Sequence, residues 1–436
     1  MQTDITMLYQ LFQEHPYIST DTRNIRENSI FFALKGANFD GNTFAAEALR
    51  QGAAYAVVSD PLLTGDRILQ VPDTLLALQS LANHHRRQLH IPVLAITGSN
   101  GKTTTKELIT TALSVKYNVH ATLGNLNNHI GVPLTLLGVT RDIEFVVCEM
   151  GANHGGEIAQ LCEIAQPTHG LITNIGQAHL EGFGSVEGVK KAKGELFEYL
   201  NQHGGTAFVN TDDPNLIDLG LPLSNKVTYG FNAAPGPNIL FTYTSSPDQH
   251  GFTLTDPASA LAIHSSMFGI YNASNMLAAY TVGKYFNVPQ DDMVDALSTF
   301  VPRANRSERL VYKNCILVKD AYNANPSSME LAIRAFSELY PDGWIVIGDM
   351  KELGEGSPGA HLHIVKLVSA MQFGRIYLVG EAFKKALVTS GIEDPRFIPA
   401  DKIESVKGGW NWADCSGNAL LLKGSRSMHL EQLLDD

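Results

Sequence analysis

The sequence predicts an α/β protein of three domains, each built on strands that alternate with helices. Short, continuously apolar runs alternate with helical patterns along most of the chain, which is typical of parallel sheets covered by helices. A chain of 436 residues that is 44% hydrophobic is long enough for two or three hydrophobic cores. We place the domains at residues 1–89, 90–301 and 302–436.

The first 89 residues predict a small N-terminal α/β domain. Residues 30–34 and 55–59 are expected as strands, and residues 43–50 as a helix that Gly52 closes. Residues 73–88 are expected as a connecting helix into the second domain. Asp73 suits the start of that helix, while Arg86 and Arg87 suit its negative end.

Two polar segments of this domain are candidate ligand loops. Thr22 and Arg23 precede the first strand, and the string FFALKGANFDGNTF carries Lys35 and Asp40. Glycines in that string let the backbone approach a ligand closely, and Arg23 and Lys35 could pair with phosphate. A solvated turn explains the same residues equally well.

The central domain begins with the stretch IPVLAITGSNGKTTTKELITTAL, residues 91–113. A buried strand is expected over 91–96, then a glycine-bearing turn, then a helix that Lys102 opens. Free backbone N–H groups and the positive end of a helix dipole favour an anion there, and Thr103 stands where a Mg²⁺ ligand is needed. This is a short P-loop of the form GxxGKT, and the alternative is a simple turn with a solvated lysine. The residues expected at the nucleotide are Gly98, Ser99, Asn100, Gly101, Lys102, Thr103 and Thr104.

Two further strands of the central domain end in polar groups. Glu149 follows the strand expected over 143–148, and a loop with His179 follows the strand over 170–173. Ligands of open parallel sheets lie beyond the carboxyl ends of the strands, so Glu149 is a candidate Mg²⁺ ligand, with a helix cap as the alternative. A single histidine is more often structural than a ligand, but the position of His179 in a glycine-flanked polar loop at the edge of the sheet favours a functional role more than usual.

Three later segments complete the expectations for this domain. Lys190, Lys191 and Lys193 indicate a solvated helix face when taken alone. Alternating apolar residues over 238–266 predict a small antiparallel patch. In the helix that follows, Asn272 and Asn275 share one face, where their amides could contact a base or cap the helix.

The C-terminal domain is predicted to be Rossmann-like. Strands are expected over 315–319, 344–347, 376–379 and 420–422, each followed by a polar loop and a helical pattern. The loops at these strand ends carry Asp320, Asn323, Asn325, Asp349, Glu352, Lys423, Ser425 and Arg426. Arg306 lies just past the domain boundary, where it could reach back toward a nucleotide.

Composition excludes several classes of protein. A formal net charge of −12 argues against a nucleic-acid-binding surface. Four widely spaced cysteines predict neither a disulfide framework nor a zinc site. No segment is apolar enough to cross a bilayer and the start of the chain lacks a basic leader, so we expect a cytoplasmic protein without membrane insertion.

Several strings together resemble the Mur ligase family. They are TGSNGKTTTKE, NLNNHIGVPLTLL, EMGANHGGEI, NIGQAHLEGFGS, KAKGELF, NRSE, DAYNANPSSM, GDMKELG and LLLKGSRSM. With FFALKGANFDGNTF they cover all three domains, and the last three are more specific than the P-loop. One departure is Tyr271, where many family members carry histidine.

The resemblance implies roles for individual residues. ATP phosphates would bind the P-loop around Lys102, and Mg²⁺ would bind Thr103 and Glu149. A second Mg²⁺ would bind His179 and a carbamylated Lys193, which with Lys102 would make the catalytic set. The nucleotide would also contact Asn272, Asn275, Arg306 and Asp320.

The resemblance also implies the substrates. The first domain, through Thr22, Arg23, Lys35 and Asp40, would receive UDP-N-acetylmuramoyl-tripeptide, with either diaminopimelate or lysine as its third residue. The third domain, through Asn323, Asn325, Lys423 and Ser425, would receive D-alanyl-D-alanine. The implied protein is a monomeric ATP-dependent amide ligase of peptidoglycan precursor synthesis that works through an acyl phosphate. Folylpolyglutamate synthetase activity and an ATP-regulated binding protein are the alternatives.

Overall fold

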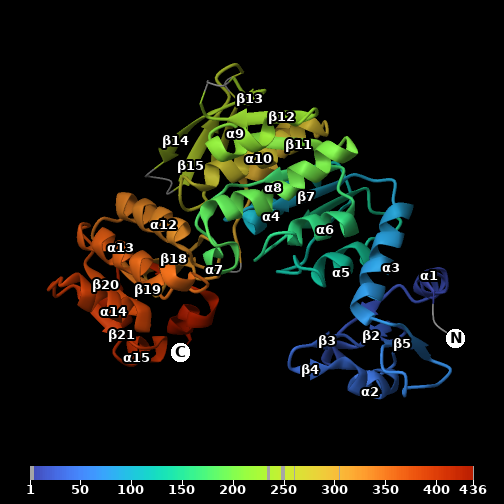
Figure 1. Cartoon of the computed structure of the whole chain (residues 1–436). Coiled ribbons are helices and arrows are strands. Elements are labelled where there is room, and N and C mark those ends of the chain that lie inside the picture. The colour runs from blue at the N-terminus through green and yellow to red at the C-terminus, as the bar shows by residue number, and fades with distance from the viewer. Residues whose placement is uncertain (1–3, 233–235, 247–250, 260, 304, 436) are drawn as a thin grey trace.

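The chain folds into three α/β domains that follow one another along the sequence (Figure 1). The computed structural model describes residues 4–232, 236–246, 251–259, 261–303 and 305–435. Figure 1 shows the N-terminal domain in blue and the C-terminal domain in orange and red on different sides of the green central domain. The predicted architecture is confirmed.

The N-terminal domain is a four-stranded parallel sheet in the order β1-β2-β5-β6, with a separate β3-β4 hairpin. The expected helix over 43–50 starts later, because Asp40 accepts the backbone N–H of Asn42 and holds the first turn as a 3-10 helix. The elements are α1 (Ile5–Glu14), β1 (Ile18–Ser19), η1 (Thr22–Asn24), β2 (Ile30–Phe32), β3 (Lys35–Gly36), β4 (Phe39–Asp40), η2 (Gly41–Phe44), α2 (Ala45–Arg50), β5 (Tyr55–Val58) and β6 (Ile68–Gln70).

Helix α3 (Thr74–Gln88) joins the N-terminal and central domains. Asp73 caps it by accepting the backbone N–H of Leu76 at 2.9 Å, as the sequence predicts. Arg86 is buried rather than solvated at the helix end. Its guanidinium donates, over 2.8 to 2.9 Å, to the backbone carbonyls of Leu89, Ala165 and Gln166. Helix α3 is therefore bonded to the C-terminal end of α6 (Glu157–Ala165).

The central domain contains a seven-stranded, wholly parallel sheet in the order β13-β12-β11-β10-β7-β9-β8. Its strands are β7 (Val93–Thr97), β8 (Val119–Ala121), β9 (Phe145–Glu149), β10 (His169–Ile172), β11 (Thr206–Asn210), β12 (Lys226–Gly230) and β13 (Ile239–Leu240). Its helices are α4 (Lys102–Leu113), α5 (Gly131–Leu137), α6 (Glu157–Ala165), α7 (Leu180–Phe183), α8 (Val186–His203), α9 (Pro214–Gly220), α10 (Asn272–Tyr285) and α11 (Gln290–Ser298).

Strand β7 lies inside this sheet, at the point where the strand order reverses. Strands β9 and β8 lie on one side of it, and β10 to β13 lie on the other. Every residue of β7 is buried, which explains its unbroken apolar sequence. Because ligands of such sheets bind at the reversal point, the loop after β7 lies at the expected place for a nucleotide.

The antiparallel patch predicted over 238–266 is present as the sheet β14-β15-β16, apart from residues 247–250 and 260, which lie outside the described part. Its strands are β14 (Thr242–Ser246), β15 (Gly251–Thr255) and β16 (Ala262–Ser265). The first residues of the segment differ from the prediction, because β13 pairs in parallel with β12 and extends the main sheet.

The C-terminal domain is a six-stranded sheet in the order β17-β18-β22-β19-β20-β21, parallel except for β17. All four expected strands are present, while β17 and β21 were not predicted. The elements are β17 (Glu308–Tyr312), β18 (Cys315–Asp320), α12 (Pro326–Leu339), β19 (Trp344–Gly348), η4 (Gly354–Gly356), α13 (Ser357–Ser369), β20 (Arg375–Val379), α14 (Glu381–Ser390), β21 (Phe397–Ala400), α15 (Ile403–Gly408), α16 (Trp412–Cys415), β22 (Ala419–Lys423), η5 (Arg426–Met428) and η6 (Leu430–Leu434).

The state of the cysteines and the character of the helices complete the description of the fold. All four cysteines are buried and unlinked. Within the described residues, no helix combines the length and the apolar character that crossing a membrane requires.

Candidate active site

The P-loop lies between β7 and α4, and its backbone conformation requires glycine at two points. A Cβ on Gly98 would stand 2.0 Å from Thr173 Oγ1, and φ of Gly98 is +139°. A Cβ on Gly101 would stand 2.8 Å from Asn275 Oδ1, and φ of Gly101 is +78°. Both glycines therefore serve close packing of the loop against neighbouring strands and helices.

Asn174, at the end of β10, shapes the loop from the next strand. Its backbone carbonyl accepts the N–H of Ser99, and its side-chain carbonyl accepts the N–H of Asn100. Its amide then donates to the carbonyl of Asn100 at 3.0 Å. Ser99 is buried and bonds to Gly176, so it fixes the loop and the following segment together.

Lys102 is folded back over the loop that precedes it. Its Nζ donates to the carbonyls of Gly98 at 2.7 Å and Ser99 at 3.3 Å. Burial lowers the pKa of Lys102, while the nearby Glu149 carboxylate opposes the shift and Arg306 adds to it. An ammonium in this position faces the space where anionic oxygens would bind above the loop. Thr104 lies in the same first turn of α4 and is partly buried.

Thr103 and Glu149 meet, as the prediction of a shared Mg²⁺ ligand pair requires. Thr103 Oγ1 donates to Glu149 Oε2 at 2.8 Å, and both residues are buried. Asn127 Nδ2 donates to the other carboxylate oxygen at 2.7 Å. A buried carboxylate whose side-chain partners are two neutral donors can offer an oxygen to a cation bound beside the phosphate loop.

These residues fit a Mg²⁺ ion that is shared with phosphate. The described residues contain no cluster of three or more histidine, cysteine, aspartate or glutamate side chains that would make a metal site by itself. Mg²⁺ typically takes one or two protein oxygens and completes its shell with phosphates and water. The Thr103–Glu149 pair offers that donor set.

Asn272 and Asn275 do share one face of α10, and they connect it to α4. Asn275 Nδ2 donates to Asn272 Oδ1 at 2.9 Å, and Asn272 donates to the carbonyl of Phe268 at 2.9 Å. Thr105 Oγ1 donates to Asn275 Oδ1 at 3.1 Å. The two amides thus stand directly behind the P-loop.

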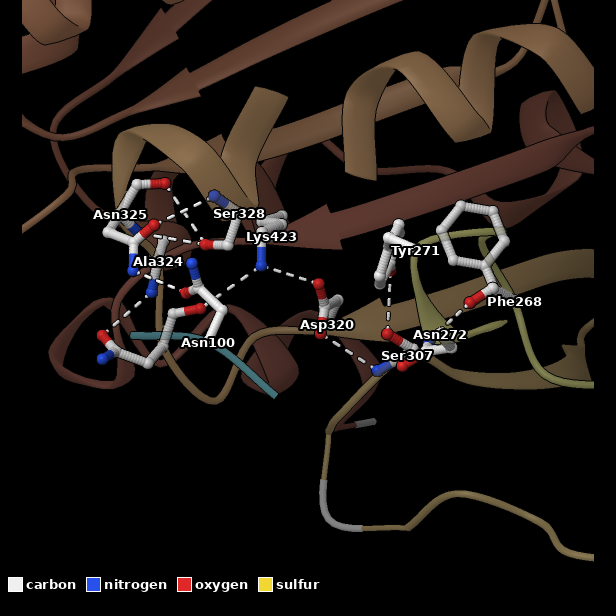
Figure 2. A network of polar contacts seen from close by, with 11 residues as sticks. Asn100, Phe268, Tyr271, Asn272, Ser307, Asp320, Ala324, Asn325, Ser328 and Lys423 are labelled. Carbon is white, nitrogen blue, oxygen red and sulfur yellow. Dashed lines mark hydrogen bonds and ion pairs between the residues drawn. The ribbon is translucent and has the colours of Figure 1, made fainter. Parts of the chain in front are cut away.

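A second polar network joins the C-terminal domain to the P-loop (Figure 2). Lys423 Nζ, buried, lies 2.6 Å from Asp320 Oδ2, and the other oxygen of Asp320 accepts the N–H of Ser307. Asn325 caps α12 and donates from its amide to Asn100 Oδ1 at 2.7 Å. The ends of β18 and β22 are therefore placed next to the nucleotide loop.

Arg306 lies near this network, although it makes no salt bridge among the described residues. Its guanidinium stacks on the Tyr322 ring with 3.5 Å to the ring centroid. Its positive charge adds to the lowering of the pKa of Lys102, so the two cations lie near each other. Tyr271 is partly buried and its hydroxyl contacts Ser307 at 2.9 Å, so it packs against the same loop.

Lys193 corrects the interpretation of the α8 lysines as a solvated face. It is 1% exposed, whereas Lys191 is exposed and Lys190 pairs with Asp218 at 3.0 Å. Lys193 Nζ donates to the carbonyl of Ala152 at 3.1 Å. Burial, with a smaller effect of Lys102, lowers the pKa of Lys193 from 10.5 to about 7. A substantial neutral fraction at neutral pH makes this amine a nucleophile.

His179 caps α7 and does not contact Lys193 directly. The Phe183 ring lies near both residues: its centroid is 5.1 Å from Lys193 Nζ and 6.5 Å from the centroid of the His179 ring. His179 instead contacts Glu352 of the C-terminal domain, with 2.5 Å between Nδ1 and Oε2.

The remaining predicted substrate residues divide into two groups. Ser425 is buried and accepts the N–H of Lys351, while the Asn323 side chain accepts the N–H of Ala324 within its own loop. The residues predicted in the first domain bond within that domain rather than to the P-loop. Arg23 pairs with Asp21 and is exposed, Lys35 pairs with Asp40 across the β3-β4 hairpin, and Thr22 starts η1.

Sequence reasoning missed several residues that build the site. They are Thr105, Lys106 and Asn127, and Asn174 was noted only as the end of its strand. Lys106 is buried and donates to the carbonyl of Thr122 at 2.8 Å. The three consecutive threonines and the NLNN string were visible, but neither tells which side chain faces the site.

A phosphate loop at the reversal point of a parallel sheet, next to a carboxylate and a docked third domain, is the site of a nucleotide-dependent group-transfer enzyme. Three family descriptions match the chain: Mur ligase family, catalytic domain, at residues 16–86; Mur ligase middle domain at 96–283; and Mur ligase, glutamate ligase domain, at 305–426. The chain belongs to the Mur ligase family and is an ATP-dependent carbon–nitrogen ligase.

Curated relatives are similar over nearly the whole chain. A UDP-N-acetylmuramoyl-tripeptide--D-alanyl-D-alanine ligase of Escherichia coli is 36% identical, covering 96% of this chain and 92% of the relative. The ligase of the same name from Bacillus subtilis is 33% identical with the same coverage.

Solved structures show the same similarity. MurF from Acinetobacter baumannii has a TM-score of 0.86 at 30% identity, with 97% of this chain and 96% of that chain covered. MurF ligase from Thermotoga maritima in complex with ADP has a TM-score of 0.84 at 27% identity, with 96% of each chain covered.

Proposed function

We propose that this chain joins D-alanyl-D-alanine to UDP-N-acetylmuramoyl-tripeptide with cleavage of ATP, giving UDP-N-acetylmuramoyl-pentapeptide, ADP and phosphate. The observation that carries the proposal is the Thr103–Glu149 pair beside the P-loop, in a chain whose relatives of that name match 96% of its length. The relative solved with ADP supports nucleotide binding at this loop.

The chemistry requires activation of the peptide carboxylate. A carboxylate resists attack by an amine, because it is an anion without a good leaving group. The γ-phosphoryl group moves from ATP to a carboxylate oxygen, which breaks the bond to ADP and forms an acyl phosphate. The amine of D-alanyl-D-alanine then attacks the carbonyl carbon, loses a proton, and phosphate leaves with the electrons of the carbon–oxygen bond.

The residues of the site supply positioning and charge for the first step. Lys102 would turn from the carbonyls of Gly98 and Ser99 toward the phosphate oxygens, and Arg306 would add positive charge from the C-terminal side. Thr103 and Glu149 would hold one Mg²⁺, which neutralises phosphate charge when it is bound. Asn272, Asn275 and Asp320 would contact the nucleoside.

Lys193 is proposed to act as a carbamate. The neutral form of its buried amine, which the lowered pKa makes available near pH 7, would react with CO₂, form a nitrogen–carbon bond and release one proton. The product places a negative charge and two oxygens where an ammonium would repel a cation, and with His179 it would hold a second Mg²⁺.

The three domains would divide the substrates. We assign residues 1–89 to the UDP-sugar peptide, 90–301 to ATP and 302–436 to the dipeptide. The polar ends of β18 and β22, docked on Asn100, support the last assignment because they bring a second substrate surface to the P-loop. ATP and UDP-linked precursors are cytoplasmic metabolites, so we place the reaction in the cytoplasm.

Phosphate release by the purified protein tests the function. UDP-N-acetylmuramoyl-tripeptides with diaminopimelate or lysine as third residue are each incubated with ATP and Mg²⁺, with and without D-alanyl-D-alanine, and the products are weighed by mass spectrometry. We expect release that depends on the dipeptide and a product of pentapeptide mass. Release only with a folate and glutamate, or nucleotide binding without release in any mixture, would reject the proposal in favour of the two alternatives.

A further inference from the structure

His179 and Glu352 are in contact where the central and C-terminal domains meet, and both have an unusual backbone conformation. His179 has φ of +51° and Glu352 has φ of +63°, the left-handed region that residues with a Cβ seldom adopt. Nδ1 of His179 lies 2.5 Å from Oε2 of Glu352, an ion-pair contact in which the ring nitrogen is not aligned for a hydrogen bond. The backbone N–H of Glu181, in α7, also points at the carbonyl of Glu352 at 3.5 Å.

The loop that presents Glu352 is fixed to the frame of the C-terminal domain. At its start, the buried Asp349 accepts two backbone N–H groups from the first turn of α14. The next residue donates its N–H to His361 Nε2 at 3.0 Å, and Lys351 donates its N–H to Ser425 Oγ at 3.0 Å. The position of Glu352 is therefore set by the fold of its own domain rather than by the contact with His179.

Stability alone does not account for this arrangement. The side chain of Glu352 is 56% exposed and that of His179 is 21% exposed. Ion pairs with this exposure contribute little to stability, because water screens them and two side chains lose freedom. Two left-handed residues with a Cβ cost more than such a pair returns. Backbone strain of this kind is typical of positions that are held for function.

The contact leaves only one ring nitrogen of His179 free for another partner. Histidines that bind metals usually direct the second ring nitrogen at a carboxylate, which fixes the tautomer and the ring orientation. With Nδ1 turned to Glu352, Nε2 is the nitrogen that remains to bind a metal.

We propose that Glu352 is a positioning residue that orients His179 toward the second Mg²⁺, so that this ion site is complete only when the C-terminal domain is docked. The inference rests on the proposed function for the presence of that ion. It adds that the dipeptide-binding domain, which carries Glu352, controls the assembly of a metal site in the ATP-binding domain.

Three variants test the proposal. Glu352→Gly removes the carboxylate and relieves the left-handed strain, Glu352→Gln keeps an oxygen acceptor, and Glu355→Gln is the matched control. Glu355 lies on the same exposed loop, and its side chain makes no hydrogen bond or ion pair among the described residues. Mn²⁺ is titrated into each full-length protein with a non-hydrolysable ATP analogue and followed by electron paramagnetic resonance, including the ¹⁴N coupling of a bound imidazole. Thermal unfolding is recorded in parallel.

We expect the wild type to bind two Mn²⁺ ions, one of them with ¹⁴N coupling that His179→Ala abolishes. Glu352→Gly should weaken the binding of that ion about 10-fold or more, as removal of other carboxylate partners of metal-bound histidines does. The affinity for the other ion should not change. The melting temperature should be unchanged or higher. Glu352→Gln should lose clearly less, and Glu355→Gln should match the wild type.

Three results would overturn the inference. The first is a wild-type protein that binds a single Mn²⁺ ion. The second is a Glu352→Gly protein that binds both ions like the wild type. The third is an equal loss of Mn²⁺ affinity in Glu352→Gln and Glu352→Gly, which would make Glu352 a direct ligand. Phosphate release with the tripeptide and dipeptide is measured on the same wild-type sample. If that activity is present, these results reject the inference alone and leave the proposed ligase function in place.

Discussion

At the scale of single residues, the site depends on charged groups that are buried without a full partner. Lys102 is bonded only to backbone carbonyls, Lys193 to a single carbonyl, and Glu149 to two neutral donors. Charged groups in such surroundings interact strongly with incoming charges, because water does not screen them. We therefore expect these groups to attract the charges of phosphate and of a cation strongly.

Lys102→Ala should reduce ligation at least ~10²-fold, because the preorganised charge facing the phosphates is lost. Turnover in the phosphate-release assay measures the loss, and a thermal melt confirms that the variant is folded. Lys191→Ala, an exposed lysine on α8, is the control and should remain fully active. Near-normal turnover of folded Lys102→Ala would reject the phosphate-binding role of this loop.

Lys193→Ala should lose activity, and formate or acetate should restore part of it by supplying the missing carboxylate near the cation. Because the pKa of Lys193 is about 7, the neutral amine that reacts with CO₂ prevails above that pH. At constant dissolved CO₂, carbamate on the wild-type protein, read by ¹³C NMR with labelled CO₂, should therefore rise as pH increases through 7.

Lys190→Ala is the matched control for this prediction, since Lys190 lies on the same helix and pairs with Asp218 at the surface. It should keep both its activity and its carbamate signal. An active Lys193→Ala protein, or a carbamate signal that survives in it, would show that Lys193 is a buried structural amine.

Sequence reasoning located the residues that directly follow strand ends. It missed the residues of other segments that hold them in place. Lys102 and Glu149 could be predicted, because each comes directly after an apolar run that has to be a buried strand. Lys193 could not be placed from its own pattern, because three lysines in one helix look alike until the packing of α8 buries one of them. The Glu352 contact depends on how two domains dock, which no local pattern encodes.

At the scale of elements, α3 belongs by its contacts to both domains that it connects. Thr74, at its first turn, donates to the carbonyl of Ala33 in the N-terminal domain at 2.9 Å. Near its other end Arg86 and Asn83 bond to carbonyls at the end of α6. Its existence and its cap were predictable from periodicity and from Asp73, but the burial of Arg86 was not, because the partner carbonyls lie about 80 residues away.

Arg86→Met should lower the free energy of unfolding by on the order of 2 to 4 kcal/mol, because three carbonyls lose a charged donor. Chemical denaturation measures this change. Arg87→Met, one position on and exposed, should shift the free energy by less than about 0.5 kcal/mol. Equal effects of the two substitutions would show that Arg86 acts only as a favourable charge at the end of the helix.

At the scale of the whole molecule, the C-terminal domain contacts the P-loop region directly, whereas the charged residues predicted in the N-terminal domain do not. The C-terminal domain meets the P-loop region through Asn325 with Asn100, Ser327 with Gln177, and Glu352 with His179. The charged residues predicted to serve the UDP-sugar peptide pair within the N-terminal domain instead. The architecture of each domain followed from strand and helix patterns, whereas these contacts between domains depend on surfaces that periodicity does not describe.

Substituting Arg23 or Lys35 by alanine should raise the KM for the UDP-sugar peptide several-fold and leave the KM for ATP nearly unchanged. The reason is that both lie in the first domain and pair only with carboxylates of that domain. Initial rates with one substrate varied at a time measure both constants. Arg50→Ala, in the same domain and paired with Glu47, is the control. A selective rise in the KM for ATP would show that the domains divide the substrates differently.

Because α3 is bonded at both ends, its length also fixes the distance between the N-terminal domain and the central sheet. Fifteen residues of helix span about 22 Å at 1.5 Å per residue, and a helix bonded at both ends neither stretches nor shortens. In Figure 1 it runs from the blue domain up to the central sheet, so it would set how far a substrate extends toward the P-loop if the first domain holds it as proposed. Each peptide residue adds at most about 3.3 to 3.6 Å of reach. The carboxylate of a precursor that is one residue shorter would lie one residue's length away from the phosphoryl group. The protein would therefore select substrates by the length of their peptide as well as by their side chains.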